Sequence, residues 1–494
     1  MRRFFIFLII FSAHFVAVHS QSAIWFDSEQ SLQDFPSKTQ KSFDNQDSII
    51  SLNFHSVTNF GDGSSVFRFP YALVGKSRLT VIVVFQSEDT LVEHGIWSVV
   101  RGGELFTGLT DRRLVRSGGE YAYPVRRRGI PLLNTSVQSF SKVRGDSESN
   151  YFVLGGVQLS ETEAFPFLGN IAECYVFDRF LQKSEILQIE TYLAIKYGIT
   201  LIASDYISGS GEVLWDYSRH KEYSNGIAGI GRDKLLSLSQ KQGCSSEEPD
   251  LLTIGVGGFS LLNKDNDYQL DTGDYLLWGH NASDLILDGF SGAEFPLLSR
   301  KWLIQRTKAE NMSTFVKFRI PDQYRDSTQI CYLSIDRSGH GDFAGNVEYI
   351  AQNQADTFGN VYFYDVVWGD GDVFSFSFCP REKMVEMVEI GEKGEVVEMV
   401  EMVEMVEMGE VGEGAFYRLY PNPTSGRYFL EAELPDITEI RIKTYTLQGG
   451  LLREWRDGGK SRYLHEGFLS EQGNYVIEVE TFFGTKVFHI VVVR

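Results

Sequence analysis

The chain has 494 residues, of which 43% are hydrophobic and 14% are aromatic, and its formal net charge is −20. A chain of this length holds roughly two to four domains, and its hydrophobic content is too high for a disordered protein and typical of β-sheet proteins. The strong negative charge argues against nucleic acid or an anionic membrane as the main partner, and it fits a protein exposed to the medium.

The N-terminus has the pattern of a secretory signal peptide. Two arginines follow Met1, an apolar run covers residues 4–18, and small residues precede a cleavage between Ser20 and Gln21. The alternative is a membrane anchor, but the run is shorter than the ~20 residues that a spanning helix needs. We therefore expect residues 1–20 to be removed, and we expect no transmembrane segment in the mature chain.

Residues 23–168 alternate between apolar runs and turns rich in Gly and Ser, as strands do. Three such runs stand out, at 49–54, 65–69 and 79–85. The last of them, LTVIVVF, is apolar at nearly every position and predicts a buried central strand.

The order of these runs resembles a known family. GDGSSVFRFP followed by LTVIVVFQ resembles the opening of laminin-G-like, concanavalin-type jelly rolls, and residues 151–157 and 167–173 resemble the closing strands. The resemblance implies a concanavalin-like jelly-roll sandwich over 21–200, a fold used for lectin-like recognition.

The stretch 95–150 matches this pattern poorly. It is rich in arginine, at Arg112, Arg113, Arg116, Arg126, Arg127 and Arg128. These residues either bind acidic sugars or lie in solvated loops, and a charge run favours the loops. A glycan hydrolase on this fold needs two carboxylates about 5–9 Å apart, and Glu104 with Asp111 is the candidate pair in this stretch. The E-x-D-x-x-E triplet of laminarinase-type enzymes is absent from 23–200, and G-x-S-x-G and H-E-x-x-H are absent from the chain.

Residues 169–177 predict a strand in which Ala172, Cys174 and Val176 share one face. We therefore expect Cys174 to be a buried thiol that fills a core position.

A helix follows this strand. Ser184 is the expected N-cap, Glu185 suits the N-terminal dipole, and Gly198 ends the helix. One face carries apolar residues that must pack on another element, namely Ile186, Ile189, Leu193 and Tyr197. The helix ends in YLAIKYG, which resembles the end of laminin-G-like domains in secreted Bacteroidetes proteins.

Residues 201–379 predict a second β-rich domain, and they resemble an uncharacterised β domain that often follows YLAIKYG in the same bacterial group. Gly226, Gly229 and Gly231 lack the order and the helix of a dinucleotide fingerprint and favour a β-turn. No cofactor is expected, although one acidic cluster offers ligands for Ca²⁺, namely Asp265, Asp267, Asp271 and Asp274. The glycine and the terminal glutamate of an EF-hand are missing from it.

The remaining cysteines are Cys244, Cys331 and Cys379. Their spacing excludes C-x-x-C zinc and redox motifs. If the chain contains a disulfide, we expect it among these three residues.

Residues 380–415 carry a glutamate at nearly every third position, with Met-Val in most gaps. A period of three matches neither a strand nor a helix. The tract is either adhesive or metal-collecting, or it is an acidic spacer, and its simple repeat favours the spacer.

Residues 416–494 open with LYPNPTSG and continue as strand-like runs. They resemble the C-terminal sorting domain of type IX secretion cargo, which implies an immunoglobulin-like sandwich that the export machinery recognises. The sorting motif is Tyr420, Pro421, Asn422, Pro423 and Gly426. The resemblance implies a secreted or outer-surface location.

The sequence thus favours an all-β binding or adhesion protein that recognises an extracellular glycan or protein. A glycan-degrading hydrolase on the concanavalin-like fold is the alternative. No catalytic, cofactor-binding or metal residue is assigned.

Overall fold

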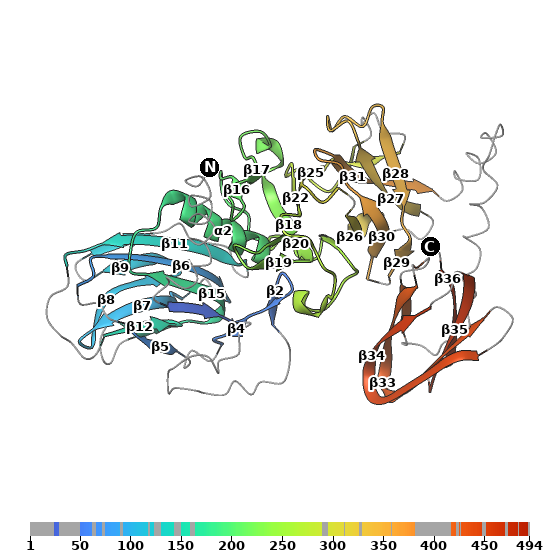
Figure 1. Cartoon of the computed structure of the whole chain (residues 1–494), viewed down its shortest axis with the longest axis horizontal. Helices are drawn as coiled ribbons and strands as arrows, with labels where there is room; N and C mark the ends of the chain where they lie inside the picture. The colour runs from blue at the N-terminus through green and yellow to red at the C-terminus, as the bar shows by residue number, and fades with distance from the viewer. Residues whose placement is uncertain are drawn as a thin grey trace, which may run out of the picture. The chain divides into compact units, whose positions relative to one another are not determined.

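The computed structural model describes residues 24–28, 50–61, 66–71, 75–88, 92–116, 119–122, 130–142, 150–158, 164–288, 295–310, 312–325, 329–356, 358–380, 416–420, 424, 426–446, 451–469, 473–482 and 484–492. The expected signal peptide with its cleavage site at Ser20 and Gln21, Arg126 to Arg128, the acidic repeat and Pro421 to Pro423 lie outside these residues. The chain divides into two compact units, Met1–Met387 and Val388–Arg494. Strands predominate in the described residues of both units (Figure 1).

The larger unit begins with a sandwich of two antiparallel sheets. One sheet has the order β1 (Ile24–Asp27), β15 (Gly169–Phe177), β6 (Arg78–Ser87) and β11 (Leu132–Ser139), with β4 (Thr58–Asn59) paired to β15. The other has the order β10 (Gly119–Ala122), β9 (Arg113–Arg116), β8 (Glu104–Thr110), β7 (Gly95–Arg101), β12 (Asn150–Leu154) and β5 (Phe67–Pro70). A separate pair joins β13 (Gly156–Gln158) to β14 (Ala164–Pro166). The chain crosses repeatedly between the two sheets, which confirms the expected jelly-roll sandwich.

The predicted central strand is β6, which lies between β15 and β11. Val81 and Val83 belong to the core between the two sheets, where they join Trp97 and Phe152 of the opposite sheet. Ile82, on the other face of β6, belongs to a second core cluster. The run is apolar on both faces because both faces are covered.

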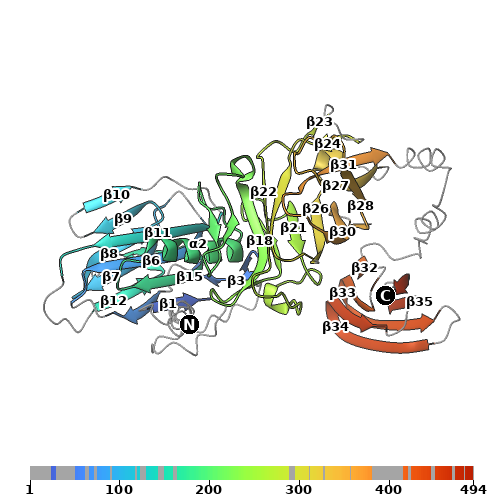
Figure 2. The same ribbon diagram turned by 45° about the horizontal axis from the view of Figure 1, so that its top comes forward.

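The poorly matching stretch 95–150 supplies most of the second sheet. Strands β7, β8, β9 and β10 follow one another as an antiparallel meander (Figure 2). Strands therefore continue through this stretch, although its resemblance to the family is weak.

The first expected strand, 49–54, is wrong in its extent. The chain instead forms a short hairpin of β2 (Ser51–Leu52) and β3 (His55–Ser56). Asn53 and Phe54 make the turn with φ of 44° and 68°. Two consecutive residues with positive φ give the tight turn that suits a two-residue hairpin loop.

The helix α2 (Lys183–Tyr197) follows β15 and ends as expected at Gly198, which has φ 65°. The expected N-cap, Ser184, is wrong because it lies inside the first turn. The N-cap is Gln182, whose backbone N–H donates to the Glu185 carboxylate at 2.7 Å. A carboxylate at this position reaches back to a backbone donor that the helix leaves unpaired.

The helix is buried more widely than one apolar stripe predicts. From Gln188 onward most of its residues are buried, and Lys196 is among them. One core cluster joins α2 to Tyr175 of the first sandwich and to Ile227 and Leu277 of the second. The helix is therefore shared between two sandwiches, which is why its second half lacks a polar face.

A β-bulge between Ile171 and Glu173 shifts the faces of β15. Cys174 and Val176 lie in the core of the first sandwich, whereas Ala172 belongs to the cluster around α2. The expectation that Ala172 shares a face with Cys174 is therefore wrong, because the extra residue of a bulge breaks the alternation.

The second sandwich has a nine-stranded and a five-stranded sheet. The first contains β19 (Leu238–Gln240), β18 (Asn225–Asp233), β22 (Tyr275–His280), β25 (Trp302–Thr307), β31 (Val373–Pro380), β24 (Leu297–Leu298) and β23 (Leu287–Asp288), with β27 (Gln329–Asp336) on β31 and β28 (Val347–Ala351) on β27. The second has the order β20 (Gln242–Cys244), β21 (Leu252–Gly255), β26 (Ser313–Arg319), β30 (Asn360–Val367) and β29 (Gln354–Ala355). Smaller elements are β16 (Tyr206–Ile207), β17 (Val213–Trp215), η2 (Lys221–Tyr223), η3 (Asn263–Asp265) and η4 (Asp322–Tyr324). This part of the chain is therefore β-rich, as expected for the fold class.

The glycines that favoured a β-turn lie in strand β18 instead. A Cβ on Gly231 would stand 2.3 Å from the ring of Tyr275, and one on Gly229 would stand 3.0 Å from Leu277. These two positions require glycine because β22 packs directly against them.

All four cysteines are buried. Cys174 is a buried thiol, as expected, and Cys244 and Cys331 are also thiols without a disulfide bond. The structure therefore gives no support to a bridge that involves Cys244 or Cys331.

The C-terminal unit contains five antiparallel strands. They are β32 (Phe416–Tyr420), β33 (Arg427–Thr446), β34 (Leu451–Phe468), β35 (Gly473–Thr481) and β36 (Gly484–Val492). Strands β33 and β34 bend together (Figure 1), and the register of their pairing shifts between Glu433 and Thr438, around Pro435. Gly426, the last residue of the expected sorting motif, has φ 124°, and a Cβ there would lie 2.6 Å from the Leu469 carbonyl oxygen. Tyr420 is the last residue of β32.

Candidate binding site between the two sandwiches

A hollow of about 420 Å³ lies where the first sandwich, helix α2 and the second sandwich meet. Its inner wall includes Trp25 and Asp27 of β1 and Lys196 of α2. Its outer part comes from β19, the residues around it, and η3 of the second sandwich. The site is therefore assembled from segments that are far apart in the sequence.

The inner wall is built on the pairing of β1 with β15. The register places Trp25 opposite Tyr175 and Asp27 opposite Glu173. The rings of Trp25 and Tyr175 stack with their centroids 6.0 Å apart. Two carboxylates directly opposite each other repel, so the second pair needs a compensating cation.

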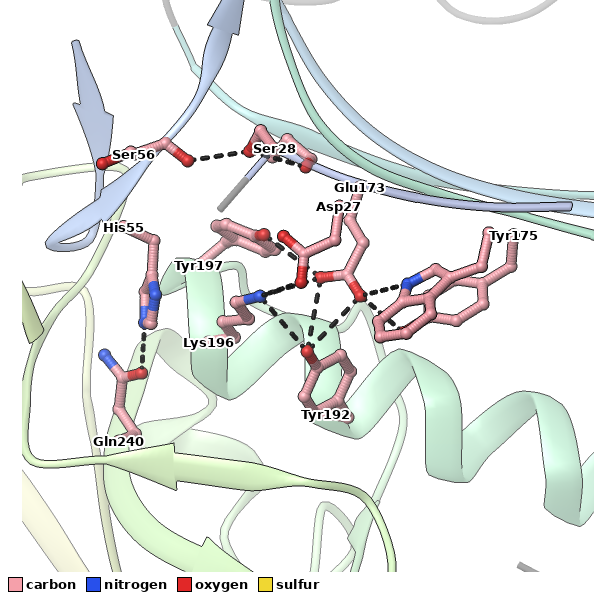
Figure 3. A network of polar contacts seen from close by, with 12 residues as sticks. Asp27, Ser28, His55, Ser56, Glu173, Tyr175, Tyr192, Lys196, Tyr197 and Gln240 are labelled. Atoms are coloured by element: carbon pink, nitrogen blue, oxygen red, sulfur yellow. Dashed lines mark hydrogen bonds and ion pairs between the residues drawn. The ribbon is translucent and has the colours of Figure 1, made fainter. Parts of the chain in front are cut away.

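Lys196 supplies that cation from α2, as Figure 3 shows. Its Nζ lies 3.1 Å from Glu173 Oε2 and 3.5 Å from Asp27 Oδ2. Burial disfavours the ammonium form, but the charges of Glu173 and Asp27 outweigh this effect and hold the pKa of Lys196 above its usual range. Lys196 is therefore charged at neutral pH.

The Glu173 carboxylate is fully buried, and neutral donors surround it. It accepts hydrogen bonds from Trp25 Nε1 at 3.0 Å and from the Tyr197 hydroxyl at 3.1 Å, and from Tyr175 and Tyr192 as well. Burial raises the pKa of these three tyrosines, which therefore remain protonated donors. A buried carboxylate with this many donors has a fixed position.

The hairpin turn connects this wall to the second sandwich. Asn53 Nδ2 donates to the carbonyl oxygens of Ile195 and Lys196, at 3.2 and 3.0 Å, and so caps the C-terminal end of α2. Asn53 Oδ1 accepts from the backbone N–H of Cys244 at 2.8 Å. In strand β3 of the same hairpin, His55 Nε2 forms a hydrogen bond with Gln240 Oε1 at 2.7 Å (Figure 3).

This connection gives a first prediction. Asn53→Gly is expected to lower the free energy of unfolding of the larger unit by about 1–3 kcal/mol, because carbonyl groups at the helix end lose their donor. Glycine adopts a positive φ without strain, and the control below shows the effect of placing glycine at another position with positive φ. Denaturant titration measures the effect. The control is Ala282→Gly, at an exposed residue with φ 57°. Equal stability of Asn53→Gly and the wild type would contradict the assignment.

The outer rim is also held by hydrogen bonds. Asn263 Oδ1 accepts from the Lys241 N–H at 2.7 Å, and Asn263 Nδ2 donates to the Ser239 carbonyl at 2.7 Å. The backbone N–H of Asn263 donates to the Phe54 carbonyl at 2.8 Å. Ser239 and Lys264 are exposed at this rim. The site thus offers hydroxyl and ammonium groups on a fixed frame.

A second hollow, of about 440 Å³, lies on the second sandwich alone. Glu248, Asp250 and Asp322 line it together with Arg319. The Glu248 carboxylate is bound by Arg300 Nη1 at 2.6 Å. No segment of the first sandwich contributes to its lining.

The structure separates the two carboxylates of the hydrolase alternative. Glu104 begins β8, and Asp111 follows the last residue of the same strand. Seven residues of extended chain span about 20 Å, so Glu104 and Asp111 are not a pair about 5–9 Å apart. Asp111 accepts a hydrogen bond from the His94 backbone N–H at 3.0 Å. The expected acid pair is therefore wrong.

Of the arginines considered for binding acidic sugars, Arg112, Arg113 and Arg116 are described, and they lie at β9 and the turn before it. Arg113 Nε bonds to Glu93 at 2.7 Å, and Arg116 Nε donates to Gln138 at 3.2 Å. Arg112 lies in the turn between β8 and β9. These contacts bind Arg113 and Arg116 within the first sandwich.

The acidic cluster does not converge. Among the described residues, which include Asp265, Asp267, Asp271 and Asp274, no group of three or more His, Cys, Asp or Glu could hold a metal ion. The Asp274 carboxylate instead accepts hydrogen bonds from the backbone N–H groups of Asp271 and Ala309.

No helix within the described ranges is long and apolar enough to cross a membrane.

The residues of this site were not found from the sequence. Glu173 and Lys196 did carry a signal, because each is a charged residue inside a run that is otherwise buried. A buried charge requires a partner. Asp27 had no comparable signal, because its partner Lys196 is 169 residues away along the chain.

Comparison with known protein families gives a match for one region of the chain. Residues 185–371 match a family model described as a domain of unknown function (DUF8202), which begins in the first turn of α2 and takes in most of the second sandwich. No curated protein matches the chain.

Solved structures give only weak likenesses. Bacteroides uniformis β-glucuronidase aligns at 9% identity and a TM-score of 0.13, over 36% of this chain and 26% of its own. This chain therefore spans about a quarter of the length of that enzyme. The BSP domain of a biofilm-associated protein aligns at 7% identity and a TM-score of 0.14, over 91% of this chain and 84% of its own. TM-scores this low carry no weight for fold or function.

Proposed function

We propose that this chain is a secreted or surface-displayed binding protein that recognises an extracellular glycan. The observation that supports this best is the hollow of about 420 Å³ between the two sandwiches. Its volume lies within the range of small-molecule sites, about 300–1,000 Å³. An aromatic ring and several polar groups on a fixed frame suit the apolar faces and hydroxyls of a sugar.

The proposal assigns delivery to the C-terminal unit. The resemblance of residues 416–494 to type IX sorting domains supports export across the outer membrane, and the N-terminal pattern supports export across the inner one. The division of the chain into two compact units supports a separation between binding and delivery.

A glycan hydrolase is the alternative from the sequence, and its candidate acid pair does not support it. That pair, Glu104 and Asp111, lies at opposite ends of β8. Two carboxylates so far apart cannot flank one glycosidic bond.

The test asks whether a polysaccharide column retains the chain while the chain leaves the polysaccharide intact. The purified chain is passed over columns that carry extracellular polysaccharides, with matrix proteins on parallel columns. We expect at least one polysaccharide to retain the chain and no reducing ends to be released.

Two results would overturn the proposal. Retention by a protein column alone would replace the glycan with a protein ligand. Steady release of reducing ends by the purified chain would make it an enzyme, whichever carboxylates carry the reaction.

A further inference from the structure

We propose that the hollow between the sandwiches takes an anionic saccharide, with the sugar beside Trp25 and its carboxylate at the rim formed by Lys241 and Lys264. This inference rests on the proposed function and specifies the ligand class of the same site. Three properties of the hollow support it: the charge of its lining, the rigidity of its rim and the kind of anion that its groups fit.

The lining is cationic in a strongly acidic protein. Three lysines and one aspartate line the hollow, namely Lys196, Lys241, Lys264 and Asp27. The whole chain has a formal net charge of −20. A local excess of lysine against this background marks a place where an anion is attracted and the rest of the surface repels it.

Lys196, on the inner wall, is paired with carboxylates, whereas Lys241 and Lys264 lie at the outer rim of the hollow. Lys196 is bound by Glu173 and Asp27. Lys241 is partly buried and donates to the Asn266 carbonyl, while Lys264 is exposed on η3. Burial lowers the pKa of Lys241, while the charge of Asp267 raises it and the charge of Arg232 lowers it. An anion at the rim therefore meets the ammonium groups of Lys241 and Lys264.

The rim is set before any ligand arrives. Asn263 fixes the backbone at Lys241 and Ser239 through its side chain, and its own N–H is bound by the hairpin. On the inner wall, the indole of Trp25 is held by its hydrogen bond to Glu173. A fixed site loses little conformational entropy when it binds, which favours affinity.

The surrounding groups select a carboxylate on a sugar. The rim has lysine ammonium groups, which act as point charges. The described residues that line the hollow include no arginine, whose guanidinium group binds phosphate in a bidentate manner. Asp27 on the inner wall, with Glu173 behind it, disfavours a single group that carries two negative charges, as a phosphate monoester does. Serine hydroxyls and an indole ring beside the lysines suit the remainder of a sugar. A uronic acid combines these properties.

The test is a calorimetric titration of the full chain with trigalacturonate, and with maltotriose as a neutral saccharide of the same length. We expect the wild type to bind trigalacturonate more tightly than maltotriose. Lys264→Glu reverses the charge of one rim lysine and is expected to weaken binding of trigalacturonate by at least about tenfold. It should leave any binding of maltotriose unchanged.

The matched control is Lys221→Glu, which makes the same charge change on the exposed η2, outside the hollow. It is expected to bind trigalacturonate as the wild type does. If both variants weaken binding equally, the effect is one of net charge and the site assignment is overturned.

Two further outcomes separate the inference from the proposed function. If columns with neutral polysaccharides retain the chain but trigalacturonate does not bind, the inference is overturned and the proposed function stands. If no polysaccharide binds, the proposed function fails and the inference fails with it.

Discussion

Lys196→Met is expected to destabilise the larger unit by about 3–5 kcal/mol, because it leaves two buried carboxylates without their cation. Asp27 and Glu173 face each other across β1 and β15, and Lys196 is the ammonium that contacts both. Methionine has a similar length, so the loss of packing is small and the loss of charge dominates. Denaturant unfolding of the full chain measures the change.

The control for this variant is Lys183→Met, an exposed lysine in the first turn of the same helix, which is expected to change stability by less than about 0.5 kcal/mol. The double variant Lys196→Met/Glu173→Gln removes one of the two uncompensated charges. It should be less destabilised than the sum of the two single variants. An additive double variant, or a stable Lys196→Met protein, would show that the three charges do not act together.

Deletion of residues 416–494 is expected to leave the protein in the periplasm of the bacterium that produces it. This prediction rests on the proposed sorting function of the C-terminal unit. On the same proposal, the N-terminal apolar segment directs the chain across the inner membrane only, and a folded sandwich does not cross the outer membrane without an export signal. Cell fractionation and surface labelling measure the distribution, and we expect nearly complete loss of the surface and medium fractions.

The control tests whether residues 416–494 are sufficient for export. Fusion of residues 416–494 to a periplasmic reporter protein is expected to bring that reporter to the surface or the medium. Unchanged surface display of the truncated chain would refute the prediction, and so would a fused reporter that stays in the periplasm.

The parts of the fold that depend on local pattern were predictable. The run at 79–85 predicted strand β6 because nearly every residue on both of its faces is apolar. Gly198 predicted the end of α2 because glycine adopts a positive φ at low cost. The hairpin at Asn53 and Phe54 was missed, because neither residue is a glycine and the turn is held by distant partners such as Cys244.

The candidate site was not predictable, for a related reason. Periodicity shows which residues of an element are buried, but it does not show which element covers them. The alternation in β15 was broken by a bulge, and the face of α2 was widened by a second sandwich. The contacts of Glu173 with Trp25 and Lys196 join segments that no local pattern connects.

The burial of α2 on both sides sets how this protein can be divided into fragments. The family match begins at residue 185, inside the helix, and the jelly-roll resemblance ends close to residue 200. A cut at either place strips one covering from a helix that contributes Leu193 and Tyr197 to a shared core. Homology boundaries and folding boundaries therefore differ here. A fragment that keeps the helix covered extends from β1 to β31, so we expect the two sandwiches to fold and unfold together.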